Sequence, residues 1–132
     1  LFRRMCFNAL ISNTDDHPRN HAVIAMENDW KLSPAYDLIP SMSISIEKRF
    51  LALSCGDEGK LARASNLLSQ CTRFLVKPDE AQTIIDTMEQ SIRERWYEIA
   101  RREGVSEKDC EAIRPAFTYE GFWLELAEEA VS

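Results

Sequence analysis

The stretch Asn13-Thr14-Asp15-Asp16-His17-Pro18-Arg19-Asn20 separates a helical pattern from a short strand pattern, and its interpretation decides the fold. Before it, apolar residues recur at helical spacing from Leu1 to Leu10, which predicts a helix that ends near Ser12. The Asn, Thr and Asp side chains compete for backbone hydrogen bonds and end helices. Because Pro18 disfavours helical geometry in the residue before it, we expect an irregular, extended loop.

Short strand patterns follow this loop. His21–Met26 and Trp30–Leu32 predict a small hairpin around the turn Glu27–Asp29. Ser43–Ile46 alternates with period two, and Phe50–Leu53 is a short apolar run, so a second small hairpin is predicted there.

The second half of the chain has helical periodicity. One apolar stripe covers residues 61–75 and another covers residues 81–100. Pro78 suits the first turn of the longer helix, and Gly104 suits its C-terminal end.

Two shorter helices are predicted after Gly104. Ser106 and Asp109 form a capping-box pattern for a helix that must stop before Pro115. Thr118 can cap a last helix that presents Tyr119, Phe122, Trp123 and Leu126. The predicted fold class is therefore α+β, mainly α: one domain over residues 1–132, with a helical bundle and one or two small β-hairpins.

Composition limits the class of protein. With 132 residues, 45% of them hydrophobic, the chain can bury a core, and it has no apolar run of about 18 residues, so we expect a soluble protein without a membrane span. The net charge of −6 disfavours direct nucleic-acid binding, which needs clustered Lys and Arg. Four widely spaced cysteines are typical of reduced, intracellular thiols.

Since helical spacing begins at Leu1 without an N-cap residue, we expect the chain to be a piece of a longer protein.

Three polar residues have the chemistry that phosphoryl transfer requires. Asp15 lies five positions before Asn20 in the loop, and Asp37 follows the predicted hairpin, which returns the chain towards that loop. A carboxylate near an acceptor hydroxyl orients it and takes its proton, while an amide oxygen and a second carboxylate can hold magnesium on the phosphates.

These residues carry a family resemblance. The spacing D-x-x-x-x-N from Asp15 to Asn20 resembles a protein-kinase catalytic loop, and N-T-D-x-H-x-x-N followed by S-P-x-Y-D-L resembles the C-terminal domain of HipA-like serine/threonine kinases, the toxins of bacterial toxin–antitoxin pairs. The likeness is strongest over residues 1–40 and implies a kinase-like C-terminal lobe. Tyr36-Asp37-Leu38 stands where ordinary protein kinases have D-F-G, so a flip that depends on glycine is not expected.

The resemblance also implies roles and partners. It implies that Asp15 is the catalytic carboxylate and that His17 assists it. His17 and Arg19 would shape the loop. Asn20 and Asp37 would bind magnesium and, through it, ATP. It implies a cytoplasmic protein, a HipB-like DNA-binding antitoxin, and a protein substrate, which by family analogy is glutamyl-tRNA synthetase. The nucleotide-binding N-terminal lobe, with its Gly-rich cover and phosphate-binding Lys, is not found among the 132 residues, so this lobe alone should be inactive.

Other interpretations stay open. His17 and His21 could suggest a zinc pair, although Pro18 breaks the helix that such spacing needs, and residues 56–60 hint at a phosphate loop but suit a solvated turn. The chain could be a non-catalytic helical interaction module in which Asp15, Asn20 and Asp37 serve as caps and turns. It could also be a lipid or small-molecule kinase lobe, since D-x-H-x-x-N occurs in phosphoinositide kinases.

Overall fold

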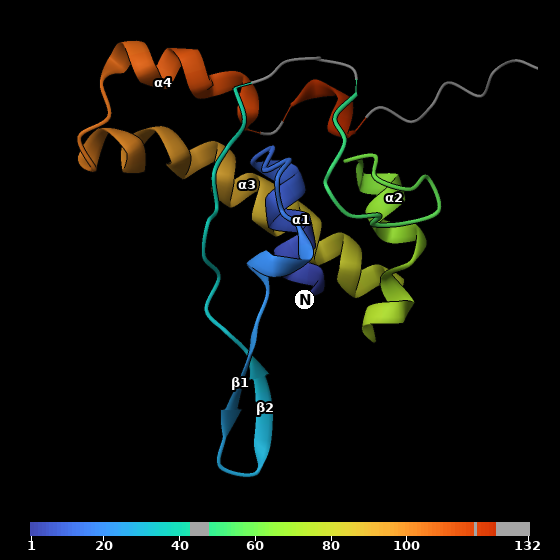
Figure 1. Cartoon of the computed structure of the whole chain (residues 1–132). Coiled ribbons are helices and arrows are strands. Elements are labelled where there is room, and N and C mark those ends of the chain that lie inside the picture. The colour runs from blue at the N-terminus through green and yellow to red at the C-terminus, as the bar shows by residue number, and fades with distance from the viewer. Residues whose placement is uncertain (43–47, 118, 124–132) are drawn as a thin grey trace, which may run out of the picture.

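A computed structural model describes residues 1–42, 48–117 and 119–123 (Figure 1). Helices form the body of the molecule, and one two-stranded antiparallel sheet lies among the described residues. The hairpin projects away from the helices. The predicted class, α+β and mainly α, is confirmed.

Two helices build the core. Helix α1 (Phe2–Leu10) crosses the long helix α3 (Pro78–Arg102), and the apolar face of each packs against the other. Because both helices are amphipathic, burial of these faces supplies most of the stabilisation that an isolated helix lacks. The buried core residues of the two helices are Phe2, Cys6, Ala9, Leu10, Ala81, Ile84, Ile85 and Ile92.

The ends of α3 follow the sequence signals. Pro78 occupies the first turn, where a missing N–H costs nothing, and Asp79 and Glu80 place negative charge near the positive end of the helix dipole. Gly104 follows the helix with a φ of 89°, a conformation that glycine adopts without the strain of a side chain. Both predicted boundaries are confirmed.

The first predicted helical stripe is interrupted. Helix α2 (Ala64–Ser69) ends at Gln70, and a 3₁₀ turn, η2 (Cys71–Phe74), continues the chain. Leu75 closes this turn in the left-handed conformation, with a φ of 60°. Residues 61–75 therefore form two short elements instead of one helix.

The C-terminal part agrees with the predicted cap. Helix α4 (Glu107–Ile113) stops before Pro115, and Ser106 Oγ accepts a hydrogen bond of 3.1 Å from the backbone N–H of Asp109. Two 3₁₀ turns follow, η3 (Arg114–Ala116) and η4 (Glu120–Phe122). Thr118 and Leu126, on which the predicted last helix depends, lie outside the described residues.

The first hairpin forms as predicted. Strands β1 (Val23–Met26) and β2 (Asp29–Leu32) pair in antiparallel register. Of the second predicted hairpin, residues 43–46 lie outside the described residues. In its other half, Phe50 makes an isolated bridge with Leu61 in place of a strand.

All four cysteines are free thiols and are buried. Within the described ranges, the structure has no helix of sufficient length and apolar character to cross a membrane.

Candidate active site

The loop after α1 starts from a buried pair of asparagines. The backbone N–H of Asn13 donates to the carbonyl of Asn8 at 2.9 Å, and Asn13 Nδ2 donates to Asn8 Oδ1 at 3.0 Å. Both residues are almost fully buried, where unmet polar groups are costly, so the paired contacts favour one geometry. Ser12, between the helix and the loop, has a φ of 56° and turns the chain away from the helix.

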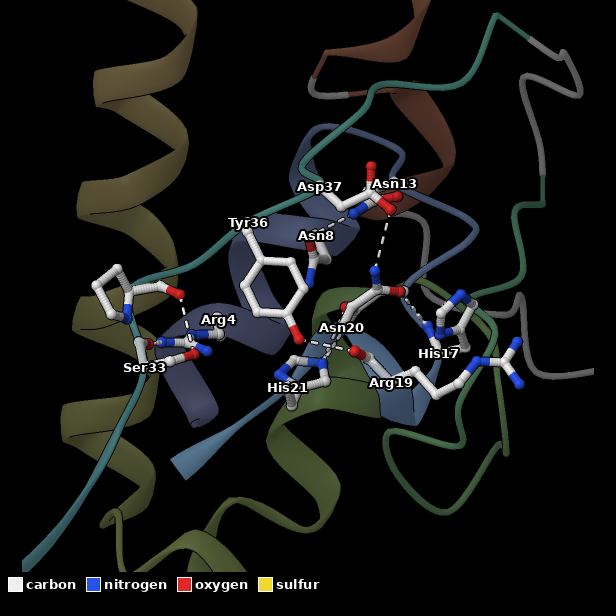
Figure 2. Close-up of polar contacts among 12 residues, drawn as sticks. Arg4, Asn8, Asn13, His17, Arg19, Asn20, His21, Ser33, Tyr36 and Asp37 are labelled. Atoms are coloured by element: carbon white, nitrogen blue, oxygen red, sulfur yellow. Dashed lines mark hydrogen bonds and ion pairs between the residues drawn. The ribbon is translucent and has the colours of Figure 1, made fainter. Parts of the chain in front are cut away.

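Inside the loop, backbone and side-chain hydrogen bonds connect its two ends (Figure 2). The N–H of His17 donates both to the carbonyl of Asp15, at 2.9 Å, and to Oδ1 of Asn20, at 3.1 Å. The N–H of Asn20 donates back to the carbonyl of His17 at 2.9 Å, within the 3₁₀ turn η1 (Pro18–Asn20). These bonds hold the backbone of Asp15 and the side chain of Asn20 close together.

The loop is joined to a distant part of the chain by an amide–carboxylate contact. Asn20 Nδ2 donates a hydrogen bond of 3.1 Å to Oδ2 of Asp37. Asn20 is buried, whereas Asp37 is exposed and has a φ of 57°, in the left-handed region that non-glycine residues seldom adopt. The sequence predicts that the hairpin brings Asp37 back to the loop, and the hydrogen bond to Asn20 confirms this position.

Two further contacts hold the coil that carries Asp37. The hydroxyl of Tyr36 donates to the carbonyl of Arg19 at 2.7 Å, and the guanidinium of Arg4, on α1, donates to the carbonyl of Ser33 (Figure 2). The coil is thus attached to the loop on one side and to α1 on the other.

The base of the loop rests on a buried arginine. Arg49 donates to Ser12 Oγ and, at 3.3 Å, to the carbonyl of Ala116, while its guanidinium lies 4.4 Å from the centre of the Tyr119 ring. Burial lowers the pKa of Arg49 and raises the pKa of Tyr119. The backbone carbonyl of Ser12 accepts a hydrogen bond of 3.0 Å from the backbone N–H of Ser41, so Ser12 contacts both the arginine that supports the loop and the coil.

Asp15 and Asp37 line the same cavity. Its volume is about 210 Å³, and both carboxylates are exposed. The lining residues are Asn13, Thr14, Asp15, Asp37, Ile39, Pro40 and Ser41. Asn20 borders this group through its hydrogen bond to Asp37.

The oxygen atoms at this place suit a hard divalent cation. Magnesium prefers carboxylate and carbonyl oxygens and keeps several waters, so one or two protein ligands suffice. Asp37 offers a carboxylate, and Oδ1 of Asn20 retains a lone pair beyond the one that faces His17. These oxygen types suit magnesium bound together with phosphates. Because Nδ2 of Asn20 faces Asp37 and Oδ1 faces the N–H of His17, joint ligation by Asp37 and Asn20 requires the amide to turn.

His17 and His21 do not behave as a pair. The ring of His17 is not part of the cavity lining, and this residue contributes to the loop through its backbone. Nε2 of His21 contacts the carboxylate of Asp16 at 2.9 Å. In the parts of the chain that the structure describes, no three His, Cys, Asp or Glu residues are grouped to hold a metal ion.

Sequence reasoning missed several members of this site. The Tyr36–Arg19 contact and the Asp16–His21 pair were not predicted, nor were Pro40 and Ser41 as cavity residues. A five-residue separation of Asp and His in one loop was the available signal for the Asp16–His21 pair. The position of Ser41 depends on the fold of the coil, for which the sequence has no pattern.

A family of known proteins matches most of the chain. Residues 1–96 match the family of HipA-like C-terminal domains, which covers α1, the loop, the hairpin, α2 and most of α3. No curated protein and no solved structure matches the chain. Because the matched region spans well over half of the 132 residues, the chain belongs to the HipA-like C-terminal domain family.

Proposed function

We propose that this chain is the catalytic lobe of an ATP- and magnesium-dependent serine/threonine protein kinase. The observation that carries the proposal is the shared cavity of Asp15 and Asp37, with Asn20 hydrogen-bonded to Asp37. Membership of the HipA-like family supports it. If Asp15 and Asp37 were only helix-cap and turn residues, nothing would require them to line the same cavity.

Asp15 acts on the acceptor. Its carboxylate is exposed at the cavity, where it accepts a hydrogen bond from a serine or threonine hydroxyl and takes the proton as the oxygen attacks phosphorus. The bond from the γ-phosphorus to the bridging oxygen of ATP breaks, and ADP leaves. Positioning and electrostatics supply most of such a reaction's acceleration.

Asn20 and Asp37 hold the nucleotide end of the reaction. When bound, magnesium neutralises charge on the phosphates. The carboxylate of Asp37 and the amide oxygen of Asn20 would be its protein ligands. The hydrogen bond from Nδ2 keeps the two side chains adjacent, and the amide would turn to present Oδ1 to the ion. That turn would exchange the hydrogen bond between the N–H of His17 and Oδ1 for the bond to the ion.

Family membership gives further proposals. A HipA-like kinase acts with an N-terminal lobe that covers the phosphates, so this lobe by itself is inactive. We place the protein in the cytoplasm, with a HipB-like antitoxin as partner. Its substrate is a protein, by analogy glutamyl-tRNA synthetase.

The test uses the complete polypeptide that contains this domain, incubated with ATP labelled in the γ-phosphate and magnesium. We expect label on serine or threonine for the wild type and for Asp86→Asn, a matched change on the exposed face of α3. Asp15→Asn and Asp37→Asn should each lose the label by a factor of about a hundred or more, as for removal of a general base or a charge-stabilising group. Equal labelling in all four proteins, or none in a folded wild type, would refute the proposal.

A further inference from the structure

One face of the β1–β2 hairpin is an exposed apolar surface. The register places Val23 opposite Leu32 and Ala25 opposite Trp30, so these four side chains share one face, called here the hairpin face. Val23 is 58% exposed and Trp30 is 68% exposed. The hairpin points away from the helices, as Figure 1 shows.

A hairpin of this kind needs a partner. Every residue of both strands is exposed. Of the hairpin face, Leu32 borders a cavity with Met5 of α1, and Trp30 lies further out towards the turn. Two short strands alone are marginally stable in water, whereas three or more strands with an apolar face are stable. Large exposed apolar patches also mark sites of association.

The free edge of β2 is defined by the hydrogen-bond pattern. The N–H of Ser33 donates to the carbonyl of Ala22 at 2.8 Å, so this pair is a hydrogen-bonded one. Antiparallel ladders alternate, which directs the backbone groups of Asp29 and Lys31 towards β1 and those of Trp30 and Leu32 outwards. Trp30 and Leu32 therefore direct their backbone groups away from β1, where another strand can reach them.

We propose that a second copy of this chain pairs with that edge, β2 against β2, antiparallel about a two-fold axis through Trp30. In this register Trp30 lies opposite the partner's Trp30, and Asp29 lies opposite the partner's Lys31. The outward backbone groups of Trp30 are those that the pairing needs. The product is one four-stranded sheet.

The charges select this register. Asp29 and Lys31 lie on the face opposite the hairpin face, and the two-fold axis creates two Asp–Lys pairs there. On the hairpin face, the two indoles meet and each covers part of the other. Strand β1 carries no charged residue, so its edge has no comparable way to fix a register.

In the single hairpin, a side chain takes the place of a partner strand at the outward N–H of Trp30. Asp29 Oδ1 accepts a hydrogen bond of 2.8 Å from the N–H of Trp30. Pairing exchanges this contact for a backbone carbonyl of the partner. It also frees the Asp29 carboxylate to meet the partner's Lys31.

A charge exchange tests the register. The molar mass of the complete polypeptide that contains this domain should rise from monomer to dimer with increasing concentration. Asp29→Lys and Lys31→Asp each place like charges opposite one another at two sites, and each should weaken association about tenfold or more. The double exchange Asp29→Lys with Lys31→Asp restores opposite charges and should recover most of it, while Lys108→Asp, on exposed α4, should have no effect.

Cross-linking tests the position of the axis. The native cysteines are buried, so Trp30→Cys adds an accessible thiol that the axis places next to its own copy. A short bis-maleimide should link this variant into dimers and leave Ile24→Cys, an exposed position on β1, mostly unlinked.

Three results would overturn the proposal. The first is a wild-type monomer at every concentration, which would assign the hairpin face to another occupant. The second is a dimer that ignores the charge exchange, and the third is equal linking of the two cysteine variants.

Discussion

Nδ2 of Asn20 donates a hydrogen bond of 3.1 Å to the carboxylate of Asp37, 17 residues further along the chain. Oδ1 of the same amide accepts from the N–H of His17, so a single buried side chain connects the loop to the coil. This amide is therefore one of the contacts that set the position of Asp37 relative to the loop.

Replacement of Asn20 should therefore destabilise the domain. Asn20→Ala removes two hydrogen bonds in a buried place, and we expect the free energy of unfolding to fall by about 1–3 kcal/mol. Urea unfolding measures this change. Gln90→Ala, at an exposed position on α3, is the control and should cost less than about 0.5 kcal/mol. Equal losses in Asn20→Ala and Gln90→Ala would show that Asn20 does not connect the loop to the coil.

Tyr36 should affect activity more than stability. Tyr36→Phe removes the hydroxyl that donates to the Arg19 carbonyl, at an exposed place where water can substitute. In the complete polypeptide, we expect kcat to fall about two- to tenfold, the equivalent of one net hydrogen bond, with little change in Tm. Tyr97→Phe, on α3, should leave kcat unchanged. A normal kcat in Tyr36→Phe would show that this contact does not position Asp37.

Gly56 cannot accept a side chain. A Cβ atom built on Gly56 lies 1.9 Å from the backbone oxygen of Asn66, in α2, so a methyl group must displace the helix. Asn66 also donates to the carbonyl of Leu61 at 2.8 Å and accepts from the N–H of Glu58 at 2.7 Å. Gly56→Ala should lower the free energy of unfolding by about 3 kcal/mol or more, as in severe overpacking.

Gly104→Ala is the matched control for Gly56→Ala. Its Cβ would meet open space, so the cost comes from the φ of 89° alone and should be about 1–2 kcal/mol. Thermal or urea unfolding of the two variants compares them. A smaller loss for Gly56→Ala than for Gly104→Ala would contradict the packing described here.

Two buried thiols should make the free energy of unfolding fall as pH rises in the alkaline range. Burial raises the pKa of Cys6 to about 12 and that of Cys55 to about 11, from an ordinary value of 9.0. Above pH 9 the unfolded chain releases these protons while the folded chain keeps them, so their contribution is complete below pH 9 and is lost as pH rises towards 12.

Urea unfolding at a series of pH values tests this dependence. The free energy of unfolding should decline between about pH 9 and about pH 10.5. The decline should be shallower in the double variant Cys6→Ala with Cys55→Ala. An identical slope in both proteins would mean that these thiols titrate alike in the folded and unfolded states.

The regular elements follow from local signals in the sequence. Helix α1, the hairpin and α3 are predictable because their apolar periods are long or their turns are marked, as by Pro78 and Gly104. The break at Gln70 is not, since the apolar stripe runs through it without Gly or Pro. There the fold of the chain overrides the local pattern.

For the site, spacing predicted which residues lie near each other but not how they bond. The chemistry of Asp15, Asn20 and Asp37 marks them in the sequence, and the hairpin brings Asp37 back to the loop. The contact of Asp16 with His21 depends on the path of an irregular backbone that no period describes. The same is true of the Tyr36 hydroxyl.

The most direct test is a crystal structure of the complete polypeptide with manganese, as a substitute for magnesium, and a non-hydrolysable ATP analogue. Manganese gives an anomalous signal that locates the ion without regard to any prior assignment. The account predicts this signal at the carboxylate of Asp37 and the amide oxygen of Asn20, with the terminal phosphate facing Asp15. An ion and nucleotide bound elsewhere, with Asp15 and Asp37 facing solvent, would contradict it.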